Sequence, residues 1–170
     1  MKSIISYLYE NSKPWRARSE VYILKDNDLI VGYVKNSNYD GYIIPGGGIK
    51  VGENPDKAAK RECIEEIGIA VKDLKILSVK KIAYHESTGT FNTRNYSRDF
   101  AGAIFTTFVG DFDKFKYTKK PEFGYRKITI DRAIEFFTNN TIRLEKVNDL
   151  YNYNKSKYVL DTLKRLKDII

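Results

Sequence analysis

Residues 47–69 read GGIKVGENPDKAAKRECIEEIGI, and both ends of a helix are marked within this stretch. Asn54 carries the kind of side chain that caps a helix, and Pro55 suits the first helical position, where its missing N–H group is of no consequence. Gly68 suits the left-handed residue that follows a last helical turn. The pattern therefore predicts a helix over residues 55–67, preceded by a glycine-rich loop.

The predicted helix sorts its side chains into two arcs at about 100° per residue. The apolar arc, which we expect to pack on a sheet, consists of Ala59, Cys63, Ile64 and Ile67. A different arc carries Glu62, Glu65 and Glu66. Like charges four residues apart cost about 0.2 to 0.5 kcal/mol, and carboxylates in the last turn oppose the helix dipole. Convergent carboxylates are what Mg²⁺ requires, but solvated glutamates are also common in helices, so the cluster alone leaves both interpretations open.

The spacing of the whole stretch is more specific than its carboxylates. The positions that matter are Gly47, Glu53, Arg61, Glu62, Glu65, Glu66 and Gly68. Their pattern resembles the Nudix box, G-x5-E-x7-R-E-U-x-E-E-x-G-U with U aliphatic, and Cys63 in the first U position is the only departure. Seven fixed identities would coincide by chance on the order of 10⁻⁸ per window. The chain is therefore similar to Nudix hydrolases.

The same glycines do not match two other phosphate-binding motifs. A P-loop requires lysine after its last glycine, whereas Gly52 is followed by Glu53. A dinucleotide-binding fingerprint that starts at Gly46 requires glycine where Val51 stands. Neither motif competes with the Nudix box.

The resemblance implies an α+β fold, a Nudix-type α/β/α sandwich with a mixed β-sheet, formed by residues 1–170 as a single domain. It also implies hydrolysis of a pyrophosphate bond in a nucleoside diphosphate linked to a moiety X, with Mg²⁺ or Mn²⁺. The implied metal ligands are the carbonyl group of Gly46 and the carboxylates of Glu62, Glu65 and Glu66. The implied catalytic residues in the box are Glu65, Glu62 and Arg61.

Within this implied site, Glu65 is either a further metal ligand or the base that activates water. Arg61 lies four residues before Glu65, so it is expected to hold that carboxylate in position. Glu53 is expected to prop the loop against the helix. These supporting contacts would orient the ligands rather than take part in the chemistry.

Two further groups outside the box are candidates. Some Nudix subfamilies carry the base on a later loop, and Glu122, just before a predicted strand, is the natural candidate, although a solvated loop glutamate explains it equally well. The loop 84–99 (YHESTGTFNTRNYSRD) interleaves aromatic residues with arginines, which suits stacking on a base and pairing with phosphate. The candidate substrate-binding residues are Tyr84, Phe91, Arg94 and Arg98. Ordinary aromatic packing is the other interpretation of this loop.

Elsewhere the periodicity predicts several strands and two helices. Residues 19–24 and 29–34 are expected to form a β-hairpin, followed by a short strand over 42–44. Longer strands are predicted over 76–83, 100–109 and 125–130. Helices are expected after Asp131 and over 155–170. The last of these carries an apolar stripe of Val159, Leu163, Leu166 and Ile170.

The composition narrows the classes of protein. The 170 residues carry a formal charge of +8, from 30 Lys and Arg against 22 Asp and Glu, which favours polyanionic partners. One cysteine argues against a disulfide scaffold, and one histidine argues against Ser-His-Asp catalysis and His-rich zinc sites. No run of about 18 apolar residues occurs, so we expect a cytoplasmic protein that does not bind a membrane.

Two classes of function remain. The first is a metal-dependent pyrophosphohydrolase, with a nucleoside triphosphate or a dinucleoside polyphosphate as the expected substrate because of the positive charge. The alternative is an RNA-cap hydrolase, or a catalytically silent Nudix-fold module that binds nucleotide or RNA. The enzyme is favoured because silent modules usually lose carboxylates of the box, and all four are present. Nucleic acid is permitted by the charge but is not the expected partner, and a homodimer is left open.

Overall fold

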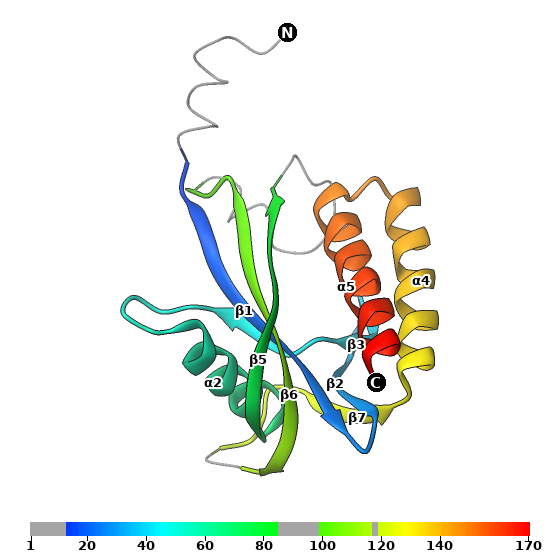
Figure 1. Ribbon diagram of the computed structural model, residues 1–170. Coiled ribbons are helices and arrows are strands. Elements are labelled where there is room, and N and C mark those ends of the chain that lie inside the picture. Colours follow the sequence, from blue (N-terminus) through cyan, green and yellow to red (C-terminus); the bar gives the residue numbers. More distant parts are fainter. Residues whose placement is uncertain (1–12, 85–98, 117–118) are drawn as a thin grey trace, which may run out of the picture.

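The computed structural model describes residues 13–84, 99–116 and 119–170, and a mixed β-sheet forms its centre (Figure 1). The strands are β1 (Trp15–Lys25), β2 (Asp28–Lys35), β3 (Asp40–Ile43), β4 (Gly46–Gly48), β5 (Ile69–Ala83), β6 (Gly102–Phe115) and β7 (Gly124–Ile128). The helices are α2 (Pro55–Ile67), α4 (Ile130–Lys146) and α5 (Leu150–Ile169). The strand order is β3-β2-β1-β6-β5, and in addition β4 pairs with β1 and β7 pairs with β2. The sheet is mixed because β1 runs parallel to β6 but antiparallel to β2 and β4.

The first two strands form the predicted hairpin. Asp26 and Asn27 at its turn have φ angles of 53° and 65°. Two consecutive left-handed residues are what a two-residue type I′ turn requires, and Asp and Asn tolerate this conformation better than most residues. β1 lies in the middle of the sheet because β2 pairs with one of its edges and β6 with the other.

Helices cover both faces of the sheet, so the molecule has three layers (Figure 1). On one face α2 buries Ala59, Cys63 and Ile67 against a cluster that includes Val21 and Ile23. On the other face α4 and α5 pack on a cluster that includes Tyr22. Successive residues of β1 thus point to opposite layers, as the pleat of a strand demands. The predicted α/β/α sandwich with a mixed sheet is confirmed. Within the described ranges, no helix is both long enough and apolar enough to cross a bilayer.

Helix α2 spans the predicted residues, but its start differs in detail. Gly68 at its end is left-handed with φ 70°, and its amide donates to the Ile64 carbonyl at 3.0 Å. Asn54 has the extended backbone of a cap, but its side chain accepts no bond from the first turn, so the predicted side-chain cap was wrong. Pro55 removes one amide that would need a partner, and the Ala58 amide donates to the Asn54 carbonyl at 3.0 Å.

Several boundaries differ from the predicted ones. The strand predicted over 76–83 begins at Ile69, and its pairing with β6 shifts register at three places. Such bulges break the alternation on which a strand prediction depends. Helix α5 begins at Leu150 and not at residue 155, because the Asp149 side chain accepts a bond from the Asn152 amide at 3.2 Å and caps it. Of the predicted apolar stripe on α5, Ile170 lies outside the core and is 49% exposed.

Candidate active site

Two carboxylates of α2 lie against the glycines of β4. The Gly46 amide donates a hydrogen bond to Glu66 Oε2 at 2.9 Å. The Glu62 carboxylate fills the space beside Gly47, where a Cβ atom would come within 2.3 Å of the carboxyl carbon. Glycine is therefore needed at position 47 because a carboxylate approaches the backbone, not because the chain turns there. β4 is itself held in place by its pairing with β1.

Arg61 connects the loop with the helix through one guanidinium group. Its Nε donates to both carboxylate oxygens of Glu53, at 3.0 and 3.2 Å, and its Nη2 donates to the Gly48 carbonyl at 2.9 Å. Its Nη1 donates to Glu62 at 2.7 Å and to Glu65 at 3.1 Å. The spacing predicted the contact with Glu65, whereas the bonds to Glu62 and Gly48 were not foreseen. The hydrogen bonds from Arg61 are the main cause of the lowered pKa of Glu53.

Glu66 has a strongly shifted acidity. Its pKa is raised from 4.5 to about 8, chiefly by burial and further by the negative charges of Glu62 and Glu122. The hydrogen bond from Gly46 and the charge of Arg18 oppose this rise. Folding thus brings carboxylates together where water screens them poorly. A divalent cation would relieve this repulsion, and Mg²⁺ and Mn²⁺ prefer oxygen ligands. The donor set therefore fits the metal that the Nudix box implies.

The carboxylates do not form a ready-made metal cage. In the part of the chain that the structure describes, no three Asp, Glu, His or Cys side chains are gathered in positions to hold a metal ion. The reason is visible in the hydrogen bonds, since Arg61 holds Glu62 and Glu65 while the Gly46 amide holds Glu66. Glu62, Glu65 and Glu66 are the side chains that could bind a cation. Ligation by the Gly46 carbonyl stays a prediction from the resemblance.

Glu122 lies beside the last turn of α2. Its amide donates to the Glu65 carbonyl at 3.1 Å, and the Phe123 amide donates to the Glu66 carbonyl at 2.7 Å. These bonds satisfy carbonyl groups that the end of a helix leaves without partners. They also place Glu122 close enough to influence the pKa of Glu66. The Glu122 side chain is exposed, and its role as a base stays a prediction.

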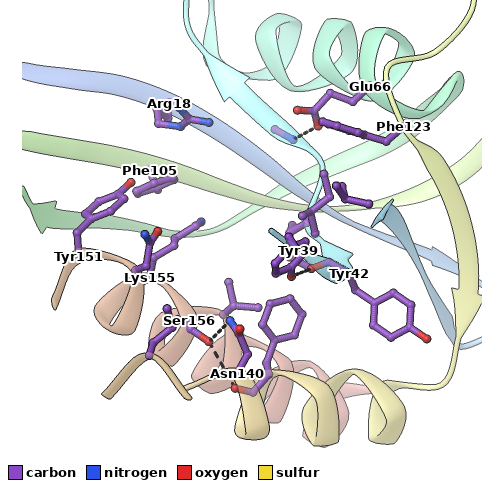
Figure 2. Close-up of a pocket in the computed structure, with 18 of the residues that line it drawn as sticks. Arg18, Tyr39, Tyr42, Glu66, Phe105, Phe123, Asn140, Tyr151, Lys155 and Ser156 are labelled. Atoms are coloured by element: carbon purple, nitrogen blue, oxygen red, sulfur yellow. Dashed lines mark hydrogen bonds between the residues drawn. The ribbon is translucent and has the colours of Figure 1, made fainter. Parts of the chain in front are cut away.

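A cavity of about 520 Å³ adjoins Glu66 (Figure 2). Gly46 and Glu66 line it on the side of α2, and α4 and α5 form the opposite wall. Its cationic lining consists of Arg16, Arg18, Arg143 and Lys155. Its aromatic lining includes Tyr39, Tyr42, Tyr84, Phe105, Phe123 and Tyr151. The volume lies within the range of about 300 to 1,000 Å³ that is usual for small-molecule sites.

Only part of the predicted substrate loop can be placed. Tyr84 lines the cavity, and its ring centroid lies 4.7 Å from that of Tyr151. Phe91, Arg94 and Arg98 lie outside the described residues. Sequence reasoning missed the four cationic residues of the cavity, which come from β1, α4 and α5 and share no local motif. The only signal that pointed to them was the excess of positive charge.

A buried ion pair forms part of the cavity wall. Lys155 on α5 donates to Glu20 on β1, whose side chain is only 4% exposed. The Thr107 hydroxyl donates to the other carboxylate oxygen of Glu20 at 3.0 Å. The Lys155 ammonium also lies 3.8 Å from the centroid of the Phe105 ring, a cation–π contact. Burial lowers the pKa of Lys155, although Glu20 opposes this effect.

Comparison with known proteins agrees with this geometry. The sequence pattern of the NUDIX domain matches residues 15–136. An RNA pyrophosphohydrolase of Stutzerimonas stutzeri (strain A1501) is 39% identical over 62 residues, which are 36% of this chain and 39% of that protein. The chain therefore matches well under half the length of this relative.

Solved structures show the same fold. A NUDIX hydrolase from Nitrosomonas europaea has a TM-score of 0.54 and 18% identity, covering 71% of this chain and 76% of its own. A mutator MutT protein from Bacillus halodurans has a TM-score of 0.53 and 17% identity, covering 71% of this chain and 72% of its own. Because the domain match spans most of the chain, this protein belongs to the NUDIX family.

We expect the metal-free protein to lose stability as the pH rises from about 5 to about 8. The pKa of Glu66 is about 8 in the native state against 4.5 for the ordinary group, so the native state binds more protons across this window. Raising the pH therefore favours the unfolded state. The Glu66→Gln variant lacks this titration. The free energy of unfolding of the variant, taken relative to that of the wild type, should therefore increase as the pH rises.

Urea unfolding in EDTA at several pH values measures this difference. Glu135→Gln is the control, because Glu135 is exposed on α4 and pairs only with Arg132 among the ion pairs described. A wild type and a Glu66→Gln variant whose stabilities differ by the same amount at every pH would show that Glu66 ionises normally.

Proposed function

We propose that this protein is a Mg²⁺- or Mn²⁺-dependent pyrophosphohydrolase that cleaves a nucleotide between two phosphates. The expected substrates are nucleoside triphosphates or dinucleoside polyphosphates. The observation that carries the proposal is that Glu66 and Gly46 line the same cavity as four cationic and several aromatic side chains. A phosphate chain at the carboxylates would leave its nucleoside in this cavity, where aromatic rings suit a base and arginines suit phosphate oxygens.

The residues of the proposed site have different roles in metal binding, orientation and proton transfer. Glu62, Glu65 and Glu66 would hold the cation, which when bound polarises phosphoryl oxygens and lowers the pKa of the attacking water. Arg61 keeps Glu62 and Glu65 oriented through its bonds at 2.7 and 3.1 Å. Arg18 lies close enough to Glu66 to influence its pKa, and it lines the cavity, where it would supply positive charge for a phosphate. Glu65 and Glu122 are the two candidates for the base that accepts a proton from water.

A second candidate is hydrolysis at the 5′ end of an RNA, including a capped end. The similarity to an RNA pyrophosphohydrolase over 62 residues supports it, as does the formal charge of +8. A silent binding module is less favoured than either hydrolase. Such a module has no need to keep Glu62 and Glu66 against β4 with Arg61 bound to three carboxylates.

We expect hydrolysis to require Mg²⁺ or Mn²⁺ and to stop in EDTA. Glu62→Gln should weaken metal binding and lower kcat by orders of magnitude, because the amide keeps the shape of the side chain and loses its charge. Phosphate release as a function of metal concentration measures both effects. Glu135→Gln serves as the control for the loss of a charge elsewhere on the surface. Activity that persists after bound metal has been removed would contradict the proposal.

Glu122→Gln should separate the two candidate bases. If Glu122 accepts the proton from water, this variant loses kcat while its apparent affinity for Mg²⁺ stays the same. Glu65→Gln should then affect metal affinity more than the chemical step. Metal titrations and the pH dependence of kcat measure the difference. An unchanged kcat in Glu122→Gln would leave the role of base to Glu65 or Glu62.

We expect substrates with several phosphates to be cleaved with a higher kcat/KM than ADP-ribose. The basic cavity and the positive charge of the chain favour polyanions, and this preference should shrink as salt rises, because exposed charges are screened over about 8 to 10 Å. Assays of dGTP, diadenosine tetraphosphate, ADP-ribose and a capped RNA at low and high salt test it. ADP-ribose as the best substrate at both salt levels would show that charge does not govern the choice. A capped RNA with the highest kcat/KM and the steepest salt dependence would favour the second candidate.

A further inference from the structure

The part of the cavity formed by α5 lies outside the residues that match the NUDIX domain. The match ends at residue 136, whereas Tyr151 and Lys155 line the cavity from α5. Lys155 extends from this helix toward the middle of the cavity below Phe105 (Figure 2). Its side chain is 23% exposed and lines the cavity. The family alone does not explain this lysine.

The ion pair with Glu20 determines the kind of ligand that Lys155 can bind. Glu20 is 4% exposed and both of its oxygens are engaged, one by Lys155 and the other by the Thr107 hydroxyl. Glu20 therefore offers nothing to a ligand in the cavity. The ammonium of Lys155 has three N–H groups, of which Glu20 takes one, so donors remain for a ligand. This end of the cavity is thus a site that donates hydrogen bonds.

The charge of the pair disfavours a phosphate at this position. The positive charge of Lys155 is already balanced by Glu20, whereas Arg18, which lies 5.8 Å from the centroid of the same Phe105 ring, has no such buried carboxylate beside it among the ion pairs described. A phosphate dianion is therefore attracted to Arg18 more strongly than to Lys155, where it would lie close to a buried carboxylate. A neutral acceptor meets no such repulsion. The surrounding wall is aromatic, with Phe105 and Tyr151 beside the lysine, and this surrounding suits a planar base. Arg18, whose charge acts on Glu66, remains for the phosphates.

We propose that Lys155 selects the base of the nucleotide by donating a hydrogen bond to the carbonyl oxygen at C6 of a purine or at C4 of a pyrimidine, the position that carries the amino group in adenine and cytosine. Keto bases, namely guanine, hypoxanthine and uracil, are then bound in preference to the amino bases adenine and cytosine, whose amino groups would face an ammonium that accepts nothing. This inference rests on the proposed function, because it places a nucleoside in the cavity.

The lysine is held firmly enough to discriminate between bases. Its bond to Glu20 and its contact with the Phe105 ring at 3.8 Å fix the ammonium from two sides. The Thr107 hydroxyl, which binds Glu20, also lies 2.7 Å from the hydroxyl of Tyr158 on α5. A bound base displaces the water that would otherwise accept a hydrogen bond from the Lys155 ammonium. If the base offers no acceptor in its place, that hydrogen bond is lost, and this loss is the physical source of selectivity.

Binding of nucleoside monophosphates tests the proposal without any chemistry, because they contain no pyrophosphate bond. IMP against AMP and UMP against CMP are matched pairs that exchange a carbonyl for an amino group. We expect calorimetric Kd values about tenfold lower for IMP than for AMP, and a preference in the same direction for UMP over CMP. Equal affinities within both pairs, or no binding of any of the four, would overturn the proposal.

A variant that removes the charge of Lys155 must change both members of the ion pair, because removing Lys155 alone leaves the buried Glu20 carboxylate without its partner. Glu20→Gln combined with Lys155→Met removes both charges together and should bring the IMP to AMP ratio close to one, mainly through weaker binding of IMP. Lys155→Arg keeps a donor and should retain the preference. Lys157→Met is the control, because Lys157 is exposed on the same helix and does not line this cavity.

The remaining outcomes separate this inference from the proposed function. A folded double variant that keeps the ratio, or that loses affinity for all four nucleotides equally, would overturn the inference, and the second result would assign Lys155 to phosphate. If the double variant does not fold, the ratios of the wild type decide alone. Equal kcat/KM for ITP and ATP would overturn the inference and leave the hydrolase standing. Selective binding of IMP by a protein that hydrolyses nothing would support the inference while the proposed function fails.

Discussion

The close approach of α2 to the glycines of β4 is the constraint on which the site depends. A Cβ atom at Gly47 would collide with the Glu62 carboxylate, and the amide of Gly46 binds Glu66. These contacts require α2 to pack tightly on the sheet, and the buried side chains of Ala59 and Cys63 provide that packing. Glu62 and Glu66 thereby lie against the backbone of β4, whereas Glu65 on the same arc is exposed to solvent. Folding free energy gained on the apolar side of α2 is what keeps its carboxylates together on the other side.

Strand β1 connects this packing of α2 with the helices on the other face of the sheet. Its residues point alternately to α2 and to α4 and α5, so that Val21 packs in one layer and Tyr22 in the other. Glu20 lies opposite Gly46 in the pairing of β1 with β4, and its side chain binds Lys155 of α5. Glu20 is therefore adjacent to β4, whose Gly46 amide binds Glu66, and it also binds α5 on the opposite wall of the cavity. The two halves of the candidate site share a rigid central strand.

Sequence reasoning succeeded where the determinants are local. The helix over residues 55–67, its left-handed end at Gly68 and the hairpin turn at Asp26 and Asn27 each depend on neighbouring residues and on a fixed spacing. It failed where tertiary contacts decide. Nothing in the sequence around Lys155 points to Glu20, because the two are 135 residues apart and only the packing of α5 brings them together. Likewise, three consecutive glycines carry no strand pattern, although β4 pairs with β1.

The distribution of charge within the site explains why one ligand can satisfy it. Arg61 offsets the charge on Glu53, Glu62 and Glu65 through four hydrogen bonds, and no hydrogen bond to Glu66 is among those described for it. Glu66 lies outside this network, next to a cavity lined by cationic side chains, and burial raises its pKa to about 8. A divalent cation bound beside Glu66 would favour its ionised form, whereas a free cation would meet repulsion from the cationic side chains of the cavity. A polyphosphate that carries its own divalent cation places each charge against its opposite, so the acidic helix and the basic cavity together favour that complex over either ion alone.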